Sequence, residues 1–281
     1  MIRTVLPEPD HISAEVARAL EEDIGTGDVT AELIGPDTRA SGHVISRQAA
    51  VLCGRAWFDE VFHQVDRSIA IRWLVTEGDT FTADQRLCEF EGPARSLLSA
   101  ERTALNFLQL LSGTATVTRR YVDAVAGTGT RILDTRKTIP GLRLAQKYAV
   151  TRGGGRNHRM GLYDAVLIKE NHIRAAGSLS TAVSAVRRLH PELTVEVEAE
   201  TLEEVSEALA AGADIIMLDN FPLEAMRRAV TLNDGRAKLE ASGGVNLGSV
   251  RDIAGTGVDF ISVGALTKDV TAVDLSMQIT G

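Results

Sequence analysis

Short apolar or β-branched runs recur through the second half of the chain and alternate with helical patterns. The strand-like runs are Arg131–Asp134, Ala165–Lys169, Thr194–Glu198, Asp214–Leu218, Ala237–Ala241 and Phe260–Val263. Helical spacing of apolar residues marks Leu179–Leu189, Thr201–Ala211, Leu223–Val230 and Leu247–Ala254. Strand–helix alternation of this kind predicts successive βα units and therefore a parallel sheet. We expect a closed or nearly closed α/β barrel. A doubly wound open sheet is the alternative, but its Gly-x-Gly-x-x-Gly turn is missing.

Residues at the helix starts support these boundaries. Thr201 and Glu204 have the spacing of a capping box, in which each satisfies a free backbone N–H of the first turn. Pro222 is placed to open the third helix and Asn246 to open the fourth.

The first part of the chain has a different pattern. An amphipathic helix is predicted over Ile12–Asp23, ended by Gly25 and Gly27. Strands are predicted at Gly42–Ser46, Ile69–Thr76 and Arg86–Phe90, with a turn at Gly78-Asp79, and a long helix at Ala94–Leu111. We therefore expect an α+β domain over residues 1–112 and the barrel over residues 113–281.

Composition and charge narrow the function. The 281 residues carry a net charge of −8, which argues against a nucleic-acid-binding protein. Residues 131–169 are the exception, because this segment contains nine Lys and Arg but only two acidic residues. A locally cationic segment in an acidic chain suggests a site for a small anion, although a solvated basic face is the simpler alternative.

The sequence also gives expectations about the compartment. No run is long and apolar enough for a membrane span, and the N-terminal residues lack the apolar region of a signal peptide. Cys53 and Cys88 are the two cysteines, which makes a disulfide framework improbable and a cytoplasmic protein the natural expectation.

Polar and small residues follow each predicted barrel strand, where the working residues of α/β barrels lie. Ser242-Gly243-Gly244 and Gly264-Ala265 end the last two strands. Small residues before a helix start expose backbone N–H groups, so these loops suit a phosphate, although they could also be simple tight turns.

Charged residues end the other strands. Glu198 and Asp219 end adjacent strands and could bind Mg²⁺ or ribose hydroxyls, or pair with Lys169 or Lys137. The cations are Arg136, Lys137, His158, Arg159 and Lys169. Arginine matches carboxylates in a bidentate manner and lysine suits phosphate, so the set predicts a multiply charged anion.

Several longer segments resemble the quinolinate phosphoribosyltransferase family. They include Glu22–Thr30, Glu101–Asn106, Ser112–Thr116, Asp134–Thr138, Lys147–Val150, Gly153–Arg159, Leu167–His172, Leu218–Asn220, Glu240–Gly244 and Ser262–Thr267. They lie in the family's order over almost the whole chain. Arg152, before the glycine run, is a mild departure.

The resemblance implies a fold, an assembly and a reaction. The fold is an α+β sandwich-like N-terminal domain followed by an open, incomplete parallel α/β barrel, and it allows the C-terminal tail to pack back on the first domain. The assembly is a homodimer in which the first domain caps the partner's barrel, with a higher homo-oligomer left open. The reaction joins quinolinate and phosphoribosyl pyrophosphate, with Mg²⁺, to give nicotinate mononucleotide, pyrophosphate and CO₂ in NAD biosynthesis.

The same resemblance assigns the site residues. Quinolinate is bound by Arg136, His158, Arg159, Lys169 and Arg102 of the partner subunit, and Thr135 joins the substrate site. The catalytic residues are Lys137, near the pyrophosphate or ribose, with Glu198 and Asp219 at the ribose hydroxyls or Mg²⁺. The 5′-phosphate is bound by Ser242, Gly243, Gly244, Gly264 and Ala265.

Three other interpretations compete with this one. The nearest is a phosphoribosyltransferase of the same fold that acts on another acid, such as the molybdenum-associated relative. A barrel lyase or isomerase acting on a sugar phosphate would use the phosphate loops but would not need so many arginines. A non-catalytic anion-binding protein is the third.

Overall fold

The computed structural model describes residues 6–280, which divide into two compact units. The barrel unit comprises Arg120–Lys137 and Gly155–Lys268. The sheet unit comprises the described residues up to Arg119, together with Thr138–Gly154 and the residues from Asp269 onward. The boundary predicted at residues 112 and 113 lies inside one long helix, α3 (Ala94–Ala124).

The barrel unit is built on six parallel strands. They are β6 (Arg131–Leu133), β7 (Val166–Ile168), β8 (Val195–Ala199), β9 (Ile215–Asp219), β10 (Lys238–Ser242) and β11 (Phe260–Ser262). Their order is β6-β11-β10-β9-β8-β7, so all six predicted strands are present. Among the described residues no ladder joins β6 to β7, so the barrel is open, as the family resemblance implied.

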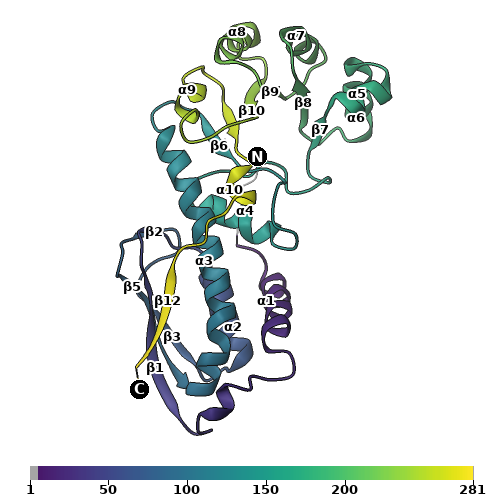
Figure 1. The fold of residues 1–281 in the computed structure, drawn as a ribbon. Coiled ribbons are helices and arrows are strands. Elements are labelled where there is room, and N and C mark those ends of the chain that lie inside the picture. The colour runs from purple at the N-terminus through teal and green to yellow at the C-terminus, as the bar shows by residue number, and fades with distance from the viewer. Residues whose placement is uncertain (1–5, 281) are drawn as a thin grey trace. The chain divides into compact units, whose positions relative to one another are not determined.

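Helices flank the strands on the outside, as Figure 1 shows for α6 to α9. They are α5 (Glu170–Ala176), α6 (Leu179–Leu189), α7 (Leu202–Ala210), α8 (Leu223–Asn233), α9 (Val250–Ala254) and α10 (Ala265–Lys268). The Thr201 side chain accepts the N–H of Glu204 and caps α7. The helix predicted from Leu247 starts later, because Asn246 Oδ1 accepts the N–H groups of Gly248 and Ser249 and forms a turn first.

Strand alternation separates the two faces of the parallel sheet. In β8, Val195, Val197 and Ala199 are buried in the apolar layer beneath the helices. Glu196 and Glu198 therefore lie on the opposite, inner face, because successive side chains of a strand alternate. The interior of the barrel thus receives charged residues from the middle of a strand as well as from its end.

The sheet unit contains an antiparallel sheet in the order β12-β1-β5-β3. Its strands are β1 (Arg39–Ser46), β3 (Ala70–Trp73), β5 (Arg86–Pro93) and β12 (Leu275–Thr280), and β2 (Ala50–Val51) pairs separately with β4 (Thr80–Phe81). The C-terminal strand β12 pairs with β1, from Ser41–Thr280 to Ser46–Leu275.

Helices of the sheet unit pack on this sheet and on each other (Figure 1). Besides α3 they are α1 (Pro9–Ile24), the short 3-10 helix η1 (Ala31–Leu33), α2 (Arg55–Val65) and α4 (Arg143–Arg152). The helix predicted to end at Leu111 continues through Gly113. A Cβ at Gly113 would lie 2.3 Å from the carbonyl oxygen of Thr271, so glycine is required there for close packing.

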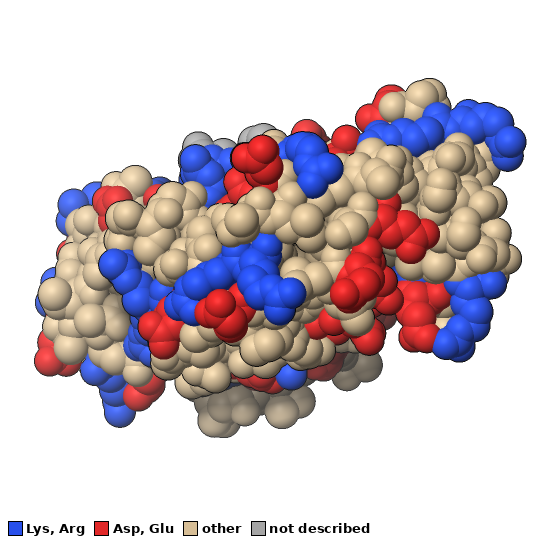
Figure 2. Space-filling view, turned by 90° about the horizontal axis from the view of Figure 1, so that it is seen from above, with Lys and Arg blue, Asp and Glu red and all other residues tan. Residues whose placement is uncertain are grey.

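Lys and Arg do not form one continuous surface on the face shown in Figure 2, because Asp and Glu lie between them. Among the described residues, none of the helices has the length and apolar character needed to cross a membrane.

Candidate active site

The carboxyl ends of the parallel strands surround a cavity of about 520 Å³ in the barrel unit. We call this the strand-end cavity. It is lined by Thr135, Arg136, Lys137, His158, Arg159, Leu167, Lys169, Glu198, Met217, Asp219, Asn220, Glu240, Ser242, Gly243 and Ser262. Most of the predicted site residues are in this set, so segments far apart in sequence meet at one end of the barrel.

The remaining predicted residues have different positions. Gly244 follows Gly243, and both have positive φ angles, +60° and +96°. Gly264 lies against Lys137, since a Cβ at Gly264 would be 3.1 Å from Cδ of Lys137. Ala265 begins α10. Arg102 is exposed on α3 and is not among the residues that line this cavity.

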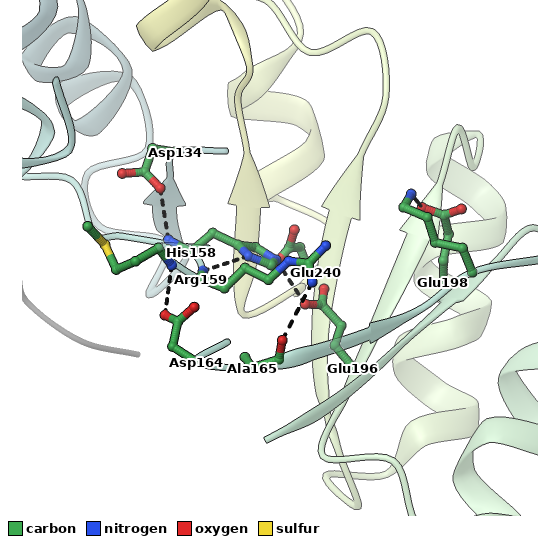
Figure 3. Close-up of polar contacts among 10 residues, drawn as sticks. Asp134, His158, Arg159, Asp164, Ala165, Glu196, Glu198 and Glu240 are labelled. Atoms are coloured by element: carbon green, nitrogen blue, oxygen red, sulfur yellow. Dashed lines mark hydrogen bonds and ion pairs between the residues drawn. The ribbon is translucent and has the colours of Figure 1, made fainter. Parts of the chain in front are cut away.

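The loop that carries His158 and Arg159 is fixed by two aspartates. Asp134 is fully buried and accepts hydrogen bonds from the side chain of Asn157 and, at 2.9 Å, from the N–H of His158. Asp164 accepts the N–H groups of Met160 and Gly161 at 2.7 and 2.9 Å. Figure 3 shows both aspartates beside the loop. Hydrogen bonds to carboxylates are among the stronger ones, so the two cations are held in defined positions.

The acidic residues at the strand ends also have partners. Glu198 forms an ion pair with Lys169 across the cavity mouth. Asp219 Oδ2 accepts the Asn220 amide at 2.9 Å. His172 takes a structural position, because its Nδ1 accepts the N–H of Lys169 at the start of α5. The pairing of Glu198 with Lys169 was one of the alternatives that the sequence left open.

A buried polar cluster lies beneath the cationic residues. His158 Nε2 is 2.8 Å from Glu196 Oε2 and 3.7 Å from Glu240 Oε2. His158 Nδ1 accepts the N–H of Arg159 at 2.8 Å, so the hydrogen of the neutral ring is on Nε2 and points to Glu196. Figure 3 shows the three side chains together with Arg159.

Burial and neighbouring charges change two pKa values in this cluster. The pKa of Glu240 is raised to about 8, mainly by burial and then by Glu196, while His158 and Ser262 act in the opposite direction. The pKa of Arg159 is lowered, first by desolvation and then by Arg136. Cations crowded in one cavity repel each other, and a bound anion relieves this repulsion.

Both halves of the chain match models of one family. The model of the quinolinate phosphoribosyl transferase N-terminal domain matches residues 28–112, and that of the C-terminal domain matches residues 114–278. The chain belongs to the quinolinate phosphoribosyltransferase family.

Related proteins agree with this membership. The chain is 45% identical over 273 residues to the nicotinate-nucleotide pyrophosphorylase [carboxylating] of Mycobacterium leprae, covering 94% of this chain and 95% of the relative. It is 43% identical to a probable nicotinate-nucleotide pyrophosphorylase [carboxylating] of Bacillus subtilis, covering 92% and 90%. The solved nicotinate-nucleotide pyrophosphorylase of Francisella tularensis superposes with a TM-score of 0.98 at 48% identity, over 100% of both chains.

Two acidic residues of the cavity region were not predicted from the sequence. Glu240 lines the strand-end cavity, and Glu196 lies behind His158. The signal that could have found Glu196 is the alternation Val-Glu-Val-Glu in β8, which places Glu196 and Glu198 on one face. An acidic residue in the middle of a buried strand is costly, which makes it a candidate for function.

The His158, Glu196 and Glu240 donor atoms lie within 4.8 Å of one another, a spacing that would also suit a metal ion. The neighbouring guanidinium of Arg159, which interacts electrostatically with Glu196, opposes a cation there. We therefore assign no metal to this cluster.

Proposed function

We propose that this family member transfers the phosphoribosyl group of phosphoribosyl pyrophosphate to the ring nitrogen of quinolinate. Decarboxylation follows, giving nicotinate mononucleotide, pyrophosphate and CO₂. The observation that carries the proposal is the strand-end cavity, where arginines, lysines and a histidine meet a glycine loop and three carboxyl groups. This chain matches at least 90% of the length of relatives that are named for this activity.

The quinolinate carboxylates would bind at the cationic side of the cavity. Arg136 and Arg159 offer planar bidentate donors, and Lys169 offers a point charge. His158 lies at the same wall, and its ring nitrogens bond to the N–H of Arg159 and to Glu196. It would therefore bind substrate only after its hydrogen bonds rearrange.

The sugar phosphate would occupy the opposite side. The backbone of Ser242–Gly244 and of Gly264-Ala265 would bind the 5′-phosphate. Lys137 would lie near the pyrophosphate or ribose, and Thr135 beside it, since Thr135 Oγ1 accepts the N–H of Lys137 at 3.0 Å. Glu198 and Asp219 would bind the ribose hydroxyls.

A Mg²⁺ bound to phosphoribosyl pyrophosphate fits this donor set. Glu198 and Asp219 line the cavity with carboxylate oxygens, which Mg²⁺ prefers, and it commonly binds through one or two carboxylates and substrate phosphates. When bound, it supplies positive charge to the leaving pyrophosphate.

The chain's own residues would act mainly by positioning and charge. The cationic wall would place the ring nitrogen in line with C1 of the ribose, which removes much of the entropic cost of bringing two anions together. Lys137 would stabilise the negative charge that grows on the leaving pyrophosphate. Glu198 and Asp219 would stabilise the positive charge that grows on the ribose, as carboxylates do for oxocarbenium-like transition states. The reaction requires no covalent intermediate with the protein.

The assembly we propose is a homodimer in which Arg102 of the partner subunit completes the quinolinate site. Its exposure on α3 supports this, because an exposed arginine is available to another subunit. Mixing inactive Arg102→Ala and Lys169→Ala subunits should restore part of the activity, because some mixed sites receive both intact residues. Mixtures that show subunit exchange but no recovery would contradict a shared site.

We place the protein in the cytoplasm. Cys53 and Cys88 are both free and buried, as is usual in a reducing compartment.

Pyrophosphate release tests the function most directly. The assay uses phosphoribosyl pyrophosphate and Mg²⁺ with quinolinate, nicotinate or nicotinamide as acceptor. We expect release with quinolinate and much less with the acceptors that lack the second carboxylate. Release with another acid but not with quinolinate would instead indicate the paralogous transferase, and no release with any acceptor would reject a transferase.

A further inference from the structure

A second cavity, of about 210 Å³, lies at the amino ends of β8 and β9. We call it the lower cavity. Its lining includes Asp164, Ala165, Glu192, Leu193, Thr194 and Ile215. It shares His158, Arg159 and Glu240 with the strand-end cavity, so these residues form the wall between the two. Glu240 thus borders both ends of the barrel interior.

The two carboxyl groups at this wall have different surroundings. Glu196 Oε2 accepts the Nε2–H of His158 at 2.8 Å. Glu240 is fully buried, and neither of its oxygens has a hydrogen bond of normal geometry among the described residues. Its distance of 3.7 Å from His158 is too long for a hydrogen bond. An ionised Glu240 would therefore be a poorly solvated charge beside another carboxylate.

The charged and polar groups that face Glu240 come from several elements. Glu196 on β8 and Asp134 after β6 raise its pKa, while His158 and the Ser262 hydroxyl on β11 lower it, and burial is the largest effect. At neutral pH Glu240 is therefore mainly protonated. A buried carboxyl group whose pKa is raised in this way is typical of an acid that transfers a proton in a reaction.

The proposed reaction needs such a proton. After the ring nitrogen of quinolinate has bonded to the ribose, the bond between C2 and its carboxylate carbon breaks and CO₂ leaves. The electron pair of that bond stays on C2, next to the positively charged nitrogen. A C–H bond must form at C2 as this bond breaks, because an unprotonated C2 would recapture CO₂, so one proton is consumed for each CO₂ released.

We propose that Glu240 supplies this proton to C2, and that water in the lower cavity returns a proton to Glu240 while substrate fills the strand-end cavity. The O–H bond of the carboxylic acid breaks as the C–H bond forms, and the resulting carboxylate takes up one proton from solvent. This inference rests on the proposed function, because it concerns the decarboxylation step.

Other groups at the cavity are less suited to this step. Lys169 is paired with Glu198, and the Nε2–H of His158 is directed to Glu196. Arginine does not release protons in proteins. Lys137 is the remaining cationic donor that lines the cavity, and the experiment below separates it from Glu240.

The first test compares Glu240→Gln with the wild-type chain in the pyrophosphate and CO₂ assays. Glutamine keeps the shape of the side chain but cannot act as an acid. General acid catalysis typically contributes about 10²–10⁴-fold. We expect CO₂ release to slow by about this factor, and the carboxylated nucleotide to accumulate while quinolinate still binds. Glu203→Gln, an exposed glutamate on α7, is the matched control and should leave both products unchanged.

The outcomes separate the inference from the proposed function. A wild-type chain without pyrophosphate release would reject the function itself. An active wild type, together with a Glu240→Gln variant that forms CO₂ and pyrophosphate in equal amounts at the wild-type rate, would reject Glu240 and leave Lys137 as the donor.

A second measurement does not depend on how well Glu240→Gln folds. In the wild type, CO₂ release should fall as the pH rises through about 8, where Glu240 loses its proton. Glu240→Asp should retain part of the rate and the pH-dependent fall. In Glu196→Gln the fall should move to lower pH, because the neighbouring charge that raises the pKa of Glu240 is gone. Profiles that are identical in wild type and Glu196→Gln would overturn the proposal.

Discussion

The interiors of the two units differ in what they bury. The sheet unit has a continuous apolar core in which Phe58, Phe62, Leu87, Leu97 and Leu108 are at most 1% exposed. The barrel unit has apolar packing between strands and helices, but its inner face buries Asp134, Asn157, Glu196 and Glu240. Burying a carboxyl group costs free energy unless it is well paired. The sheet unit also buries Glu15 and Lys147, but Glu15 accepts the Trp57 Nε1–H at 2.7 Å. The barrel unit therefore has the costlier interior, where carboxyl groups needed for chemistry are buried without full pairing.

The carboxyl groups inside the barrel unit also differ in how completely they are hydrogen-bonded. Asp134 and Asp164 are satisfied by the loop that they fix. Both oxygens of Glu240 and one oxygen of Glu196 have no hydrogen-bond partner of normal geometry within residues 6–280. This difference separates residues that hold the site together from residues that are kept for the reaction, and mutations can test it.

The largest effect is expected from Arg159→Ala. Removal of the guanidinium deletes a donor for the quinolinate carboxylates and leaves Glu196 without a neighbouring positive charge. Losing one partner of a buried charged pair costs about 2–5 kcal/mol, so quinolinate affinity should fall by roughly 30-fold to several thousand-fold. Separate calorimetric titrations should show phosphoribosyl pyrophosphate binding nearly as before. Equal loss of both ligands would contradict the assignment, and Arg227→Ala, exposed on α8, is the control.

Leu87→Ala tests the apolar core of the sheet unit. Leu87 is fully buried in β5, and replacing such a leucine by alanine costs about 2–5 kcal/mol. Urea unfolding should show this loss, whereas Leu33→Ala, at 86% exposure, should change stability by less than about 0.5 kcal/mol. Quinolinate affinity per folded molecule should be unchanged. A stability loss as small as that of Leu33→Ala would mean that this core is less tightly packed than the structure shows.

Glu240→Met should stabilise the fold while it removes decarboxylation. Replacing buried ionic groups by apolar residues is often neutral or stabilising by about 1–4 kcal/mol. The effect has a defined pH dependence. The folded pKa of about 8 is above the usual value of 4.5, so Glu240 contributes most to stability below pH 4.5 and loses this contribution as the pH rises through 8. The advantage of Glu240→Met in urea unfolding should therefore be larger at pH 9 than at pH 6. A variant that is less stable than wild type at pH 9 would contradict the view that the ionised Glu240 carboxylate destabilises the folded chain.

Gly243→Ala should give the smallest effect, confined to the phosphate side of the cavity. Its φ of +96° is unfavourable for alanine, and the added Cβ would lie 2.1 Å from Asn220 Oδ1. Strained backbone of this kind costs about 1–3 kcal/mol, so the KM for phosphoribosyl pyrophosphate should rise roughly 5–100-fold with quinolinate binding preserved. Gly235→Ala is the matched control, because its φ is +73° but no atom lies within 4 Å of the added Cβ. An equal rise in KM for both variants would show that the effect is general.

Much of the fold could be predicted from sequence because it depends on local patterns. Six strands and the helices α6 to α8 follow from apolar periodicity and from the residues at their starts, such as Thr201 and Pro222. Helix α2 was not predicted, although it carries Trp57 and Phe58 of the core. The early end predicted for α3 has a similar cause, because Gly113 serves a contact with Thr271 that the sequence pattern cannot show.

What the sequence by itself determined is the parallel strand–helix unit and the set of charged and small residues that follow its strands. Parallel strands bring such residues to one edge, so their identity and order were enough to predict that Arg136, Arg159, Lys169 and Glu198 meet. Only the tertiary structure decided that Glu196 and Glu240 meet beside His158 and that the ring nitrogens of His158 bond to protein groups. The physical reason is that ionisation and hydrogen bonding depend on burial and on neighbours from distant strands, which no local pattern specifies.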